Sequence, residues 1–314
     1  MPSITQLQYI VALHRTGHFG RAAAECHVSQ PTLSSLVAKA EEELGVVLFD
    51  RRTKPIVPTE PGLALIVLAQ EVVTAHARLI AAAAGAAEAS GQLVLGVIPT
   101  LAPYVLPWFL GPLVERYPRV SLTLEERTTA DIIDEIRTLW MDAGILATPL
   151  GEPALESRVL FYDPFYVYAE AGSALLEADE VAVADLDPAG LWLLEDGHCF
   201  RNQVIHLCGG DTRRALGSVR FEAGSFETLR ALIDAAGGFT LVPESYARTL
   251  TPGVRLARVR PLREPTPVRE VSLVSHRSSW KAALLEAIAG ILRARVPRCF
   301  PRERGASEVL PIDE

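Results

Sequence analysis

The sequence predicts an α/β protein in three parts, and three observations along its 314 residues support this. Residues 1–58 carry the apolar spacing of three short helices, which favours a small helical domain. Residues 59–89 form an alanine-rich stretch with no proline after its first turn, as in a single long helix. From residue 90 to 296, strand-like runs alternate with helical stretches, which indicates an α/β domain. Residues 297–314 show no periodicity, and we expect a loose tail there.

The N-terminal domain has the pattern of a helix-turn-helix. Its first helix ends at Gly17, and the first two helices carry the apolar residues Leu7, Ile10, Val11 and Leu13, then Phe19, Ala22, Ala23 and Cys26. Ser29 is a good N-cap for a third helix, which ends at Gly45. A recognition helix contacts the major groove of DNA with its first residues, which here are Ser29, Gln30, Pro31, Thr32, Ser34 and Ser35. The alternative is a three-helix domain whose polar helix start is only solvated.

A cationic hairpin is expected directly after these helices. In VVLFDRRTKPIVPTEPG, strand-like flanks enclose Arg51, Arg52 and Lys54, which suggests a β-wing that carries cations towards the DNA backbone. The whole chain has a formal net charge of −8, but residues 1–58 hold six basic and five acidic side chains. An acidic protein with such an N-terminal domain can still bind phosphates through a few well-placed cations.

The long helix over 59–89 is expected to join two subunits. Thr59 caps it, and its apolar stripe is formed by Leu65, Leu68, Val72 and Leu79. About 30 residues would extend roughly 45 Å, which is too long for one small domain to cover. The helix is therefore predicted to dimerise, and the alternative is a helix that lies on its own domain. Residues 81–91 are expected to form the helix end and a hinge.

The C-terminal domain is expected to hold a mostly parallel sheet with helices on both faces. The predicted strands are 93–98, 121–126, 143–148, 165–169, 191–195, 239–242 and 271–275, and a helix is expected over 278–296. Ligand sites in such sheets lie at the carboxyl ends of the strands. Thr100 and Thr129 lie at two of these ends, and their alternative role is to cap the helices that follow.

Two of the four cysteines, Cys199 and Cys208, are nine positions apart in a segment with helix-like apolar spacing. If that segment is helical, about 1.5 Å per residue holds them roughly 13 Å apart. A disulfide needs Cα atoms within about 4.4–6.8 Å, so the pair can oxidise only if the segment refolds. The neighbouring cations His198 and Arg201 favour the thiolate, whereas Glu195 and Asp196 act against it. The alternative is that both cysteines are buried apolar filler.

The composition excludes several classes of protein. With 49% hydrophobic and 22% charged residues it is ordinary for a globular chain, and four cysteines do not make a disulfide scaffold. The chain opens without a signal-peptide pattern and holds no run of about 18 apolar residues, so we expect a cytoplasmic protein with no membrane segment. A disulfide in that compartment would be transient. No cofactor and no metal site are expected.

The motifs together resemble a known family. FGRAAAECHVSQPTLSSLVAKAEEELGVVLFDRR, with Thr59 and Gly62 after it, is similar to the winged helix-turn-helix of LysR-type transcriptional regulators. LLEDGHC with a second cysteine nine residues later, LGVIPTLAPYVLP (95–107) and SFETLRALIDAAGGFTLVP (225–243) resemble the peroxide-sensing OxyR branch. The resemblance runs over the whole chain. It implies two Rossmann-like lobes of the periplasmic-binding-protein type II fold, with the sensing site between them.

The resemblance also implies roles for residues and partners. Cys199 would be the thiol that attacks hydrogen peroxide, and Cys208 its disulfide partner. The positions that match the family's sensing pocket are Thr100, Thr129, His198 and Arg269. Double-stranded DNA, a second copy of the chain in a homodimer or homotetramer, and RNA polymerase are the implied partners. The chain departs from the family in LWMDAGIL, with Leu139 and Trp140, and in the GGDT that follows Cys208.

Two alternative functions stay open at this point. A regulator of the same fold could bind a small metabolite between the lobes, with the cysteines incidental. A thiol peroxidase would use the same reactive cysteine, but an enzyme has no use for the N-terminal domain. Stoichiometric peroxide separates the three hypotheses, because a redox regulator is oxidised once, a metabolite sensor ignores it and an enzyme cycles with reductant.

Overall fold

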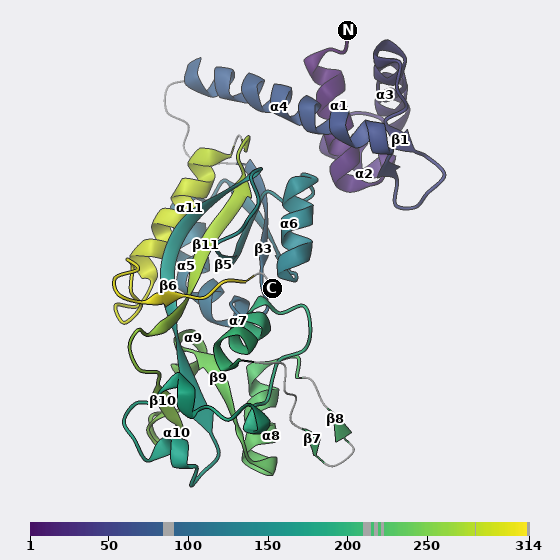
Figure 1. The fold of residues 1–314 in the computed structure, drawn as a ribbon. Helices are drawn as coiled ribbons and strands as arrows, with labels where there is room; N and C mark the ends of the chain where they lie inside the picture. The colour runs from purple at the N-terminus through teal and green to yellow at the C-terminus, as the bar shows by residue number, and fades with distance from the viewer. Residues whose placement is uncertain (84–90, 210–214, 217–218, 221–222, 280, 313–314) are drawn as a thin grey trace.

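The computed structural model describes residues 1–83, 91–209, 215–216, 219–220, 223–279 and 281–312 (Figure 1). Its N-terminal domain holds α1 (Ile4–Thr16), α2 (Phe19–Glu25) and α3 (Gln30–Leu44), followed by the two-stranded antiparallel wing of β1 (Phe49–Asp50) and β2 (Val57–Pro58). Ser3 and Gln6 form a capping box on α1, and Ser29 caps α3. Gly17 and Gly45 end these helices with φ of 59° and 67°, which is left-handed backbone that favours glycine. The helix-turn-helix prediction is thus confirmed.

The long helix is α4 (Glu60–Ala83), which packs along α1 and then extends away from the N-terminal domain (Figure 1). Thr59 caps it as expected, since its hydroxyl accepts a hydrogen bond from the Gly62 N–H at 3.0 Å. Residues 84–90, and with them most of the expected hinge, lie outside the described residues. Within the parts of the chain that the structure describes, no helix is both long and apolar enough to cross a bilayer.

The C-terminal domain has two lobes around one sheet. Lobe I contains β3 (Gly91–Val97), β4 (Val120–Glu126) and β5 (Ala143–Thr148) with α5 (Ala102–Arg116), α6 (Thr129–Arg137) and α11 (Ala282–Arg295). Lobe II contains β9 (Phe239–Pro243), β10 (Val259–Pro261), α8 (Phe226–Ala236), α9 (Glu244–Ala247) and α10 (Pro252–Arg258). The long strands β6 (Leu155–Ala169) and β11 (Pro267–His276) form the middle of the sheet, and β6 runs from one lobe into the other (Figure 1). Each lobe has its own buried apolar core.

The remaining elements are short. They are α7 (Cys199–Cys208), the hairpin of β7 (Ala215–Leu216) and β8 (Val219–Arg220), the terminal strand β12 (Glu308–Val309), and three 3₁₀ turns, η1 (Ala174–Leu176), η2 (Val183–Asp185) and η3 (Pro188–Gly190). α7 ends at Gly209, whose φ of 76° again suits glycine. The helical spacing read between the two cysteines is therefore confirmed.

Three expectations about the C-terminal domain are wrong. The sheet is mixed. β6 pairs antiparallel with β9, β10 and β11, and β11 pairs antiparallel with β5. Among the described strands, β3 runs parallel to β4 and β5, and β11 to β12. The run 191–195 forms only isolated bridges, Leu191 to Phe239 and Leu194 to Ala223. The described part of the expected tail, residues 297–312, is not loose, because Phe300, Leu310 and Ile312 are buried in the cores. Local apolar spacing reports burial, but strand pairing also needs a neighbour at hydrogen-bonding distance.

Candidate functional site

Cys199 is the first residue of α7 and is buried in the core of lobe I. Burial raises the pKa of its thiol above the usual range. The Thr129 hydroxyl, the Arg269 guanidinium and backbone groups of Phe200 and Ala147 act in the opposite direction and lower that pKa. A helix N-terminus also favours a thiolate. The site therefore keeps the sulfur protonated by burial, and it provides groups that stabilise the anion when it forms.

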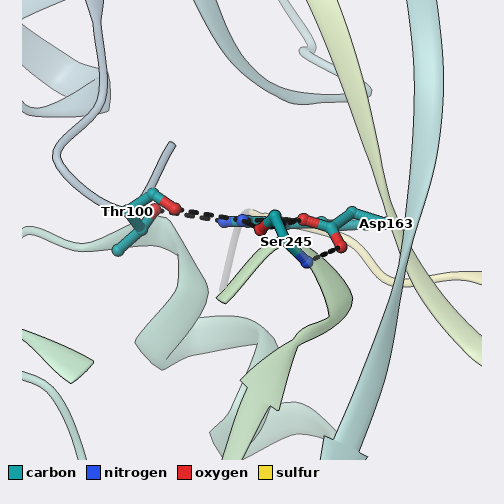
Figure 2. Close-up of polar contacts among 4 residues, drawn as sticks. Thr100, Asp163 and Ser245 are labelled. Atoms are coloured by element: carbon teal, nitrogen blue, oxygen red, sulfur yellow. Dashed lines mark hydrogen bonds and ion pairs between the residues drawn. The ribbon is translucent and has the colours of Figure 1, made fainter. Parts of the chain in front are cut away.

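Arg269 is fully buried at the junction of the lobes and is held by three residues from different elements (Figure 2). Its guanidinium donates to Asp163 Oδ2 from Nε and Nη2, at 3.1 and 2.9 Å. It also donates to the hydroxyl and the carbonyl oxygen of Thr100, both at 3.1 Å. Asp163 in turn accepts hydrogen bonds from the N–H and hydroxyl of Ser245, at 3.1 and 2.8 Å. Thr100 follows β3, Asp163 lies in β6 and Ser245 in α9, so this network fixes the lobes to each other beside the thiol.

The Thr129 hydroxyl oxygen is buried and has no hydrogen-bond partner among the residues that the structure describes. It nevertheless lies close enough to the thiol to lower its pKa. Thr129 opens α6, which is seated tightly on the sheet because a Cβ at Gly144 would come within 2.3 Å of Ile132. A small hydrogen-bonding molecule at the thiol would find an unpaired hydroxyl there.

The two cations expected to activate the thiol are engaged elsewhere. His198 lies 3.7 Å from Glu195, and burial lowers the pKa of its imidazole, so it is mostly neutral near pH 7. Arg201 pairs with Asp196 at 2.7 Å and donates to the Leu194 carbonyl at 3.2 Å. The cation that acts on Cys199 is Arg269, seventy positions later in the chain.

Cys208 is the last residue of α7 and lies in the core of lobe II. Burial raises the pKa of its thiol to about 12. The helix holds the two cysteines about 13.5 Å apart, at about 1.5 Å per residue, which is too far for a disulfide. The expected separation is thus present, and each sulfur is buried in a different core.

The other two cysteines lack this arrangement. Burial raises the pKa of the Cys26 thiol, which the charge of Arg15 lowers. Cys299 is exposed, and its sulfur accepts a hydrogen bond from Arg248 at 2.9 Å. The sequence offered no sign of that contact. Because Cys299 is exposed and lies outside the Cys199 site, it is a control in thiol experiments.

The expected DNA-contacting residues lie together at the start of α3. Gln30, Pro31, Thr32 and Ser35 are exposed there, and Ser34 is half-buried. The Ser29 and Thr32 hydroxyls lie 2.7 Å apart and cap the helix, so part of their hydrogen-bonding capacity is already used. In the wing, Arg51 is bound to Glu41 at 2.6 Å and lies over the Phe19 ring, whereas the Arg52 side chain is 91% exposed.

The apolar stripe of α4 divides into two parts. Leu65 is partly buried and packs against the core of the N-terminal domain. Leu68, Val72 and Leu79 are 54, 46 and 67% exposed. These three, with Ile80 at 57%, offer exposed apolar surface on the described part of α4.

Asp163 and Ser245 are the functional residues that the sequence did not indicate. Asp163 stands directly opposite Arg269 in the register of β6 and β11, so strand pairing places the two charges together. An isolated Asp within an apolar strand was the only local signal, because a charge in such a run needs a buried partner.

Comparison with known proteins agrees with this architecture. Residues 4–63 match the bacterial regulatory helix-turn-helix protein family, lysR type, and residues 86–297 match the LysR substrate binding domain. The chain is 34% identical to the DNA-binding transcriptional dual regulator OxyR of Escherichia coli (strain K12), over 96% of this chain and 98% of that protein. It is also 34% identical to a hydrogen peroxide-inducible genes activator of Dickeya chrysanthemi, over 93% and 95% of the two chains.

Solved structures give the same result. A full-length OxyR mutant from Pseudomonas aeruginosa superposes with a TM-score of 0.81 at 34% identity, and the match covers 93% of this chain and 98% of that one. The two family matches together cover the helix-turn-helix and the two-lobed domain. The relatives and this structural neighbour each extend over both domains. The chain therefore belongs to the LysR family of bacterial transcriptional regulators and, within it, to the OxyR branch.

Proposed function

We propose that this chain is a DNA-binding transcriptional regulator that senses hydrogen peroxide by oxidation of Cys199 and a disulfide with Cys208. The observation that carries the proposal is the pair of buried thiols at the two ends of α7, each in the core of a different lobe. Relatives named as hydrogen peroxide-inducible gene activators support the choice of oxidant.

The chemistry takes two steps. The Cys199 thiolate attacks one peroxide oxygen, the O–O bond breaks, and hydroxide leaves to become water with the proton that the thiol gave up. The sulfur, now a sulfenic acid, has lost two electrons to the peroxide. In this proposal Thr129 and Arg269 stabilise the attacking anion, since both lower the pKa of the thiol, and the Thr129 hydroxyl would hydrogen bond to a peroxide oxygen. The Cys208 sulfur then displaces the hydroxyl of the sulfenic acid, which leaves as water, and the S–S bond forms.

The second step requires α7 to unwind. Both sulfurs must leave their cores, so the oxidised protein loses the helix and the packing between α7 and both lobes. A bistable element of this kind converts a local bond into a change of shape. A dithiol reductant that supplies two electrons would restore the helix.

The partners follow from the remaining surfaces. Double-stranded DNA would bind to the start of α3 and to the wing, with Arg52 and Lys54 on phosphates. A second copy of the chain would cover Leu68, Val72 and Leu79 of α4, giving a dimer or tetramer on two half-sites. We infer contact with RNA polymerase and action in the cytoplasm from the function itself, and no step of the chemistry requires a metal or cofactor.

A metabolite sensor is the competing hypothesis for this fold. The buried side chain of Arg269, held by Thr100, Asp163 and Ser245, already fills the junction between the lobes. This favours the thiol over a bound metabolite as the receptor.

One experiment tests the proposal. Full-length protein is treated with one equivalent of hydrogen peroxide, its thiols are mapped by mass spectrometry, and the operator footprint is recorded in parallel. We expect a Cys199–Cys208 disulfide and a shifted footprint, neither of which should occur in Cys199→Ser. Cys208→Ser should stop at a trappable sulfenic acid, and Cys26→Ala and Cys299→Ala should behave like the wild type.

Two results would contradict the proposal. An unmodified Cys199 with a shifted footprint would replace it by the metabolite sensor. Continued consumption of peroxide in the presence of reductant, at an enzymatic rate, would replace it by a peroxidase.

A further inference from the structure

The last described residues form a strap, which we define as residues 307–312, across the middle of the C-terminal domain. β12 pairs in parallel with the start of β11 at Pro267 and Val268. The Leu310 N–H donates to the Val268 carbonyl at 3.0 Å and extends that pairing by one residue. Leu310 is fully buried in the core of lobe II, and Ile312, two residues later, is buried in the core of lobe I. Two apolar anchors in different cores fix the strap in place.

The strap contacts α7 directly. Gln203, in the middle of α7, is fully buried, and its side-chain amide donates to the Leu310 carbonyl at 3.1 Å. The side-chain oxygen of Gln203 has no hydrogen-bond partner among the described residues. The bond to Leu310 is therefore the side-chain hydrogen bond of Gln203 in the described part of the chain. Leu310 also shares a core with Val204 and Cys208 of the same helix. The strap and the C-terminal half of α7 also line one open groove, together with residues 182–183 and 263–265.

We propose that this strap is a brake on the redox switch, which holds α7 helical and slows disulfide formation after Cys199 has been oxidised. The inference rests on the proposed function. Gln203 lies between the two cysteines, so its bond to Leu310 opposes unwinding of the segment that must change shape to join them. Gln203 and Leu310 are not among the groups that lower the pKa of Cys199, so loss of their bond is expected to leave the rate of the first step unchanged. The strap thus separates the sensitivity of the thiol to peroxide from the rate of the change of shape.

The variant Gln203→Leu tests the brake with little disturbance of the fold. Leucine keeps the size and helix propensity of glutamine and removes the amide, while β12 stays paired with β11. Deletion of residues 307–314 removes the strap from the other side. Glu308→Gln is the matched control, since it changes an exposed side chain of the strap and leaves Leu310 in place.

Two measurements on the full-length protein read the result. In the reduced state, amide hydrogen exchange over residues 199–208 should be about tenfold faster in Gln203→Leu, which is the effect of losing one buried hydrogen bond. It should be faster still in the deletion, which also removes the buried side chains of Leu310 and Ile312. After mixing with hydrogen peroxide, the sulfenic acid of Gln203→Leu should form at the wild-type rate and convert to the disulfide about tenfold faster. Glu308→Gln should match the wild type in both.

The two proposals fail in different ways. Wild-type exchange over α7 in Gln203→Leu would overturn the brake whether or not peroxide acts on the protein. So would a faster first step together with an unchanged second step. An unmodified Cys199 in the wild type would instead overturn the proposed function, with the hydrogen-exchange result still deciding whether the strap stabilises α7.

Discussion

At Cys199, burial and the neighbouring groups have opposite effects on the pKa of one thiol. Burial is the larger effect and raises its pKa, while Thr129 and Arg269 lower it. In the reduced fold this group therefore stabilises the protein below the ordinary pKa of a cysteine, about 8.5. That contribution is lost as the pH rises through the higher pKa of the folded state. The nucleophile is the thiolate, so stability and reactivity change in opposite directions with pH.

The rate of Cys199 oxidation should rise with pH. Between pH 6 and 8 the thiol is mostly protonated, so each pH unit should increase the rate about tenfold. Rapid mixing with hydrogen peroxide and a sulfenic-acid trap measures this on the Cys208→Ser protein. Thr129→Val should lower the rate throughout that range, whereas Thr128→Val, which removes the cap of α6, is the control. A rate independent of pH would mean that the thiol is already ionised at pH 6.

Arg269 and Asp163 form a fully buried ion pair, so the two residues should be strongly coupled in stability. Arg269→Gln leaves the Asp163 carboxylate buried without its counter-charge, which typically costs about 3–5 kcal/mol. Chemical denaturation of the reduced protein measures the free energy of unfolding. The double variant Arg269→Gln, Asp163→Asn should recover part of the loss, and additive effects would contradict the coupling.

At the scale of elements, the wing distinguishes two neighbouring arginines. Arg51 is tied to Glu41 across the domain and is 41% exposed, whereas Arg52 pairs with Asp50 of its own wing at 3.1 Å and its side chain is 91% exposed. Arg52→Ala should weaken DNA binding on all sequences and reduce the salt slope by about one unit, as expected for one phosphate contact. Gln30→Ala should instead change which sequence is preferred. Titrations at several salt concentrations separate the two effects, and equal changes on all sequences for both variants would refute the assignment of Gln30 to bases.

Helix α4 divides its apolar stripe between the core of the N-terminal domain and exposed positions that we propose a second subunit covers. Leu65 belongs to the core of the N-terminal domain, and the exposed residues beyond it are free to bind a second subunit. Leu68→Glu with Val72→Glu should give monomers in light scattering and abolish operator binding, because carboxylates in an apolar interface are costly to bury. Leu65→Ala should lower the melting temperature and leave the subunits associated. A double variant that stays dimeric would place the interface elsewhere.

At the scale of the whole molecule, the N-terminal domain contacts lobe I within the same chain. His14 of α1 is buried, its Nε2 hydrogen bonds to the Thr138 carbonyl at the end of α6, and its ring meets Trp140 edge-on at 5.2 Å. Leu139, between these two, has a φ of 63°, which a non-glycine residue adopts at an energetic cost. The departure seen in LWMDAGIL thus lies at a contact between domains. Since α6 also begins at Thr129, one helix joins the thiol pocket to this contact.

This contact predicts an unusual titration of His14. Burial lowers the pKa of its imidazole, and the bond to Thr138 offsets only part of that effect. Trp140→Ala should hydrate the ring and return its pKa towards the ordinary value of about 6.5. Hydrogen exchange at the histidine C2 position, followed by mass spectrometry, reports this for each histidine. Trp140→Phe keeps a ring against His14 and is the control, and a wild-type His14 that titrates normally would mean that the domains separate in solution.

The local features of this protein could be predicted from its amino-acid sequence. Caps, glycine ends and apolar spacing fixed the helices of the N-terminal domain, α4 and α7, because these depend on residues within a few positions of one another. Tertiary structure alone decided the rest. Arg269, the cation beside Cys199, is held by Asp163, which lies 106 positions earlier in the chain, and by Thr100, which lies 169 positions earlier. Strand register, the buried end of the chain and the contact of His14 with Trp140 likewise depend on which distant surfaces pack together, and no local pattern encodes that choice.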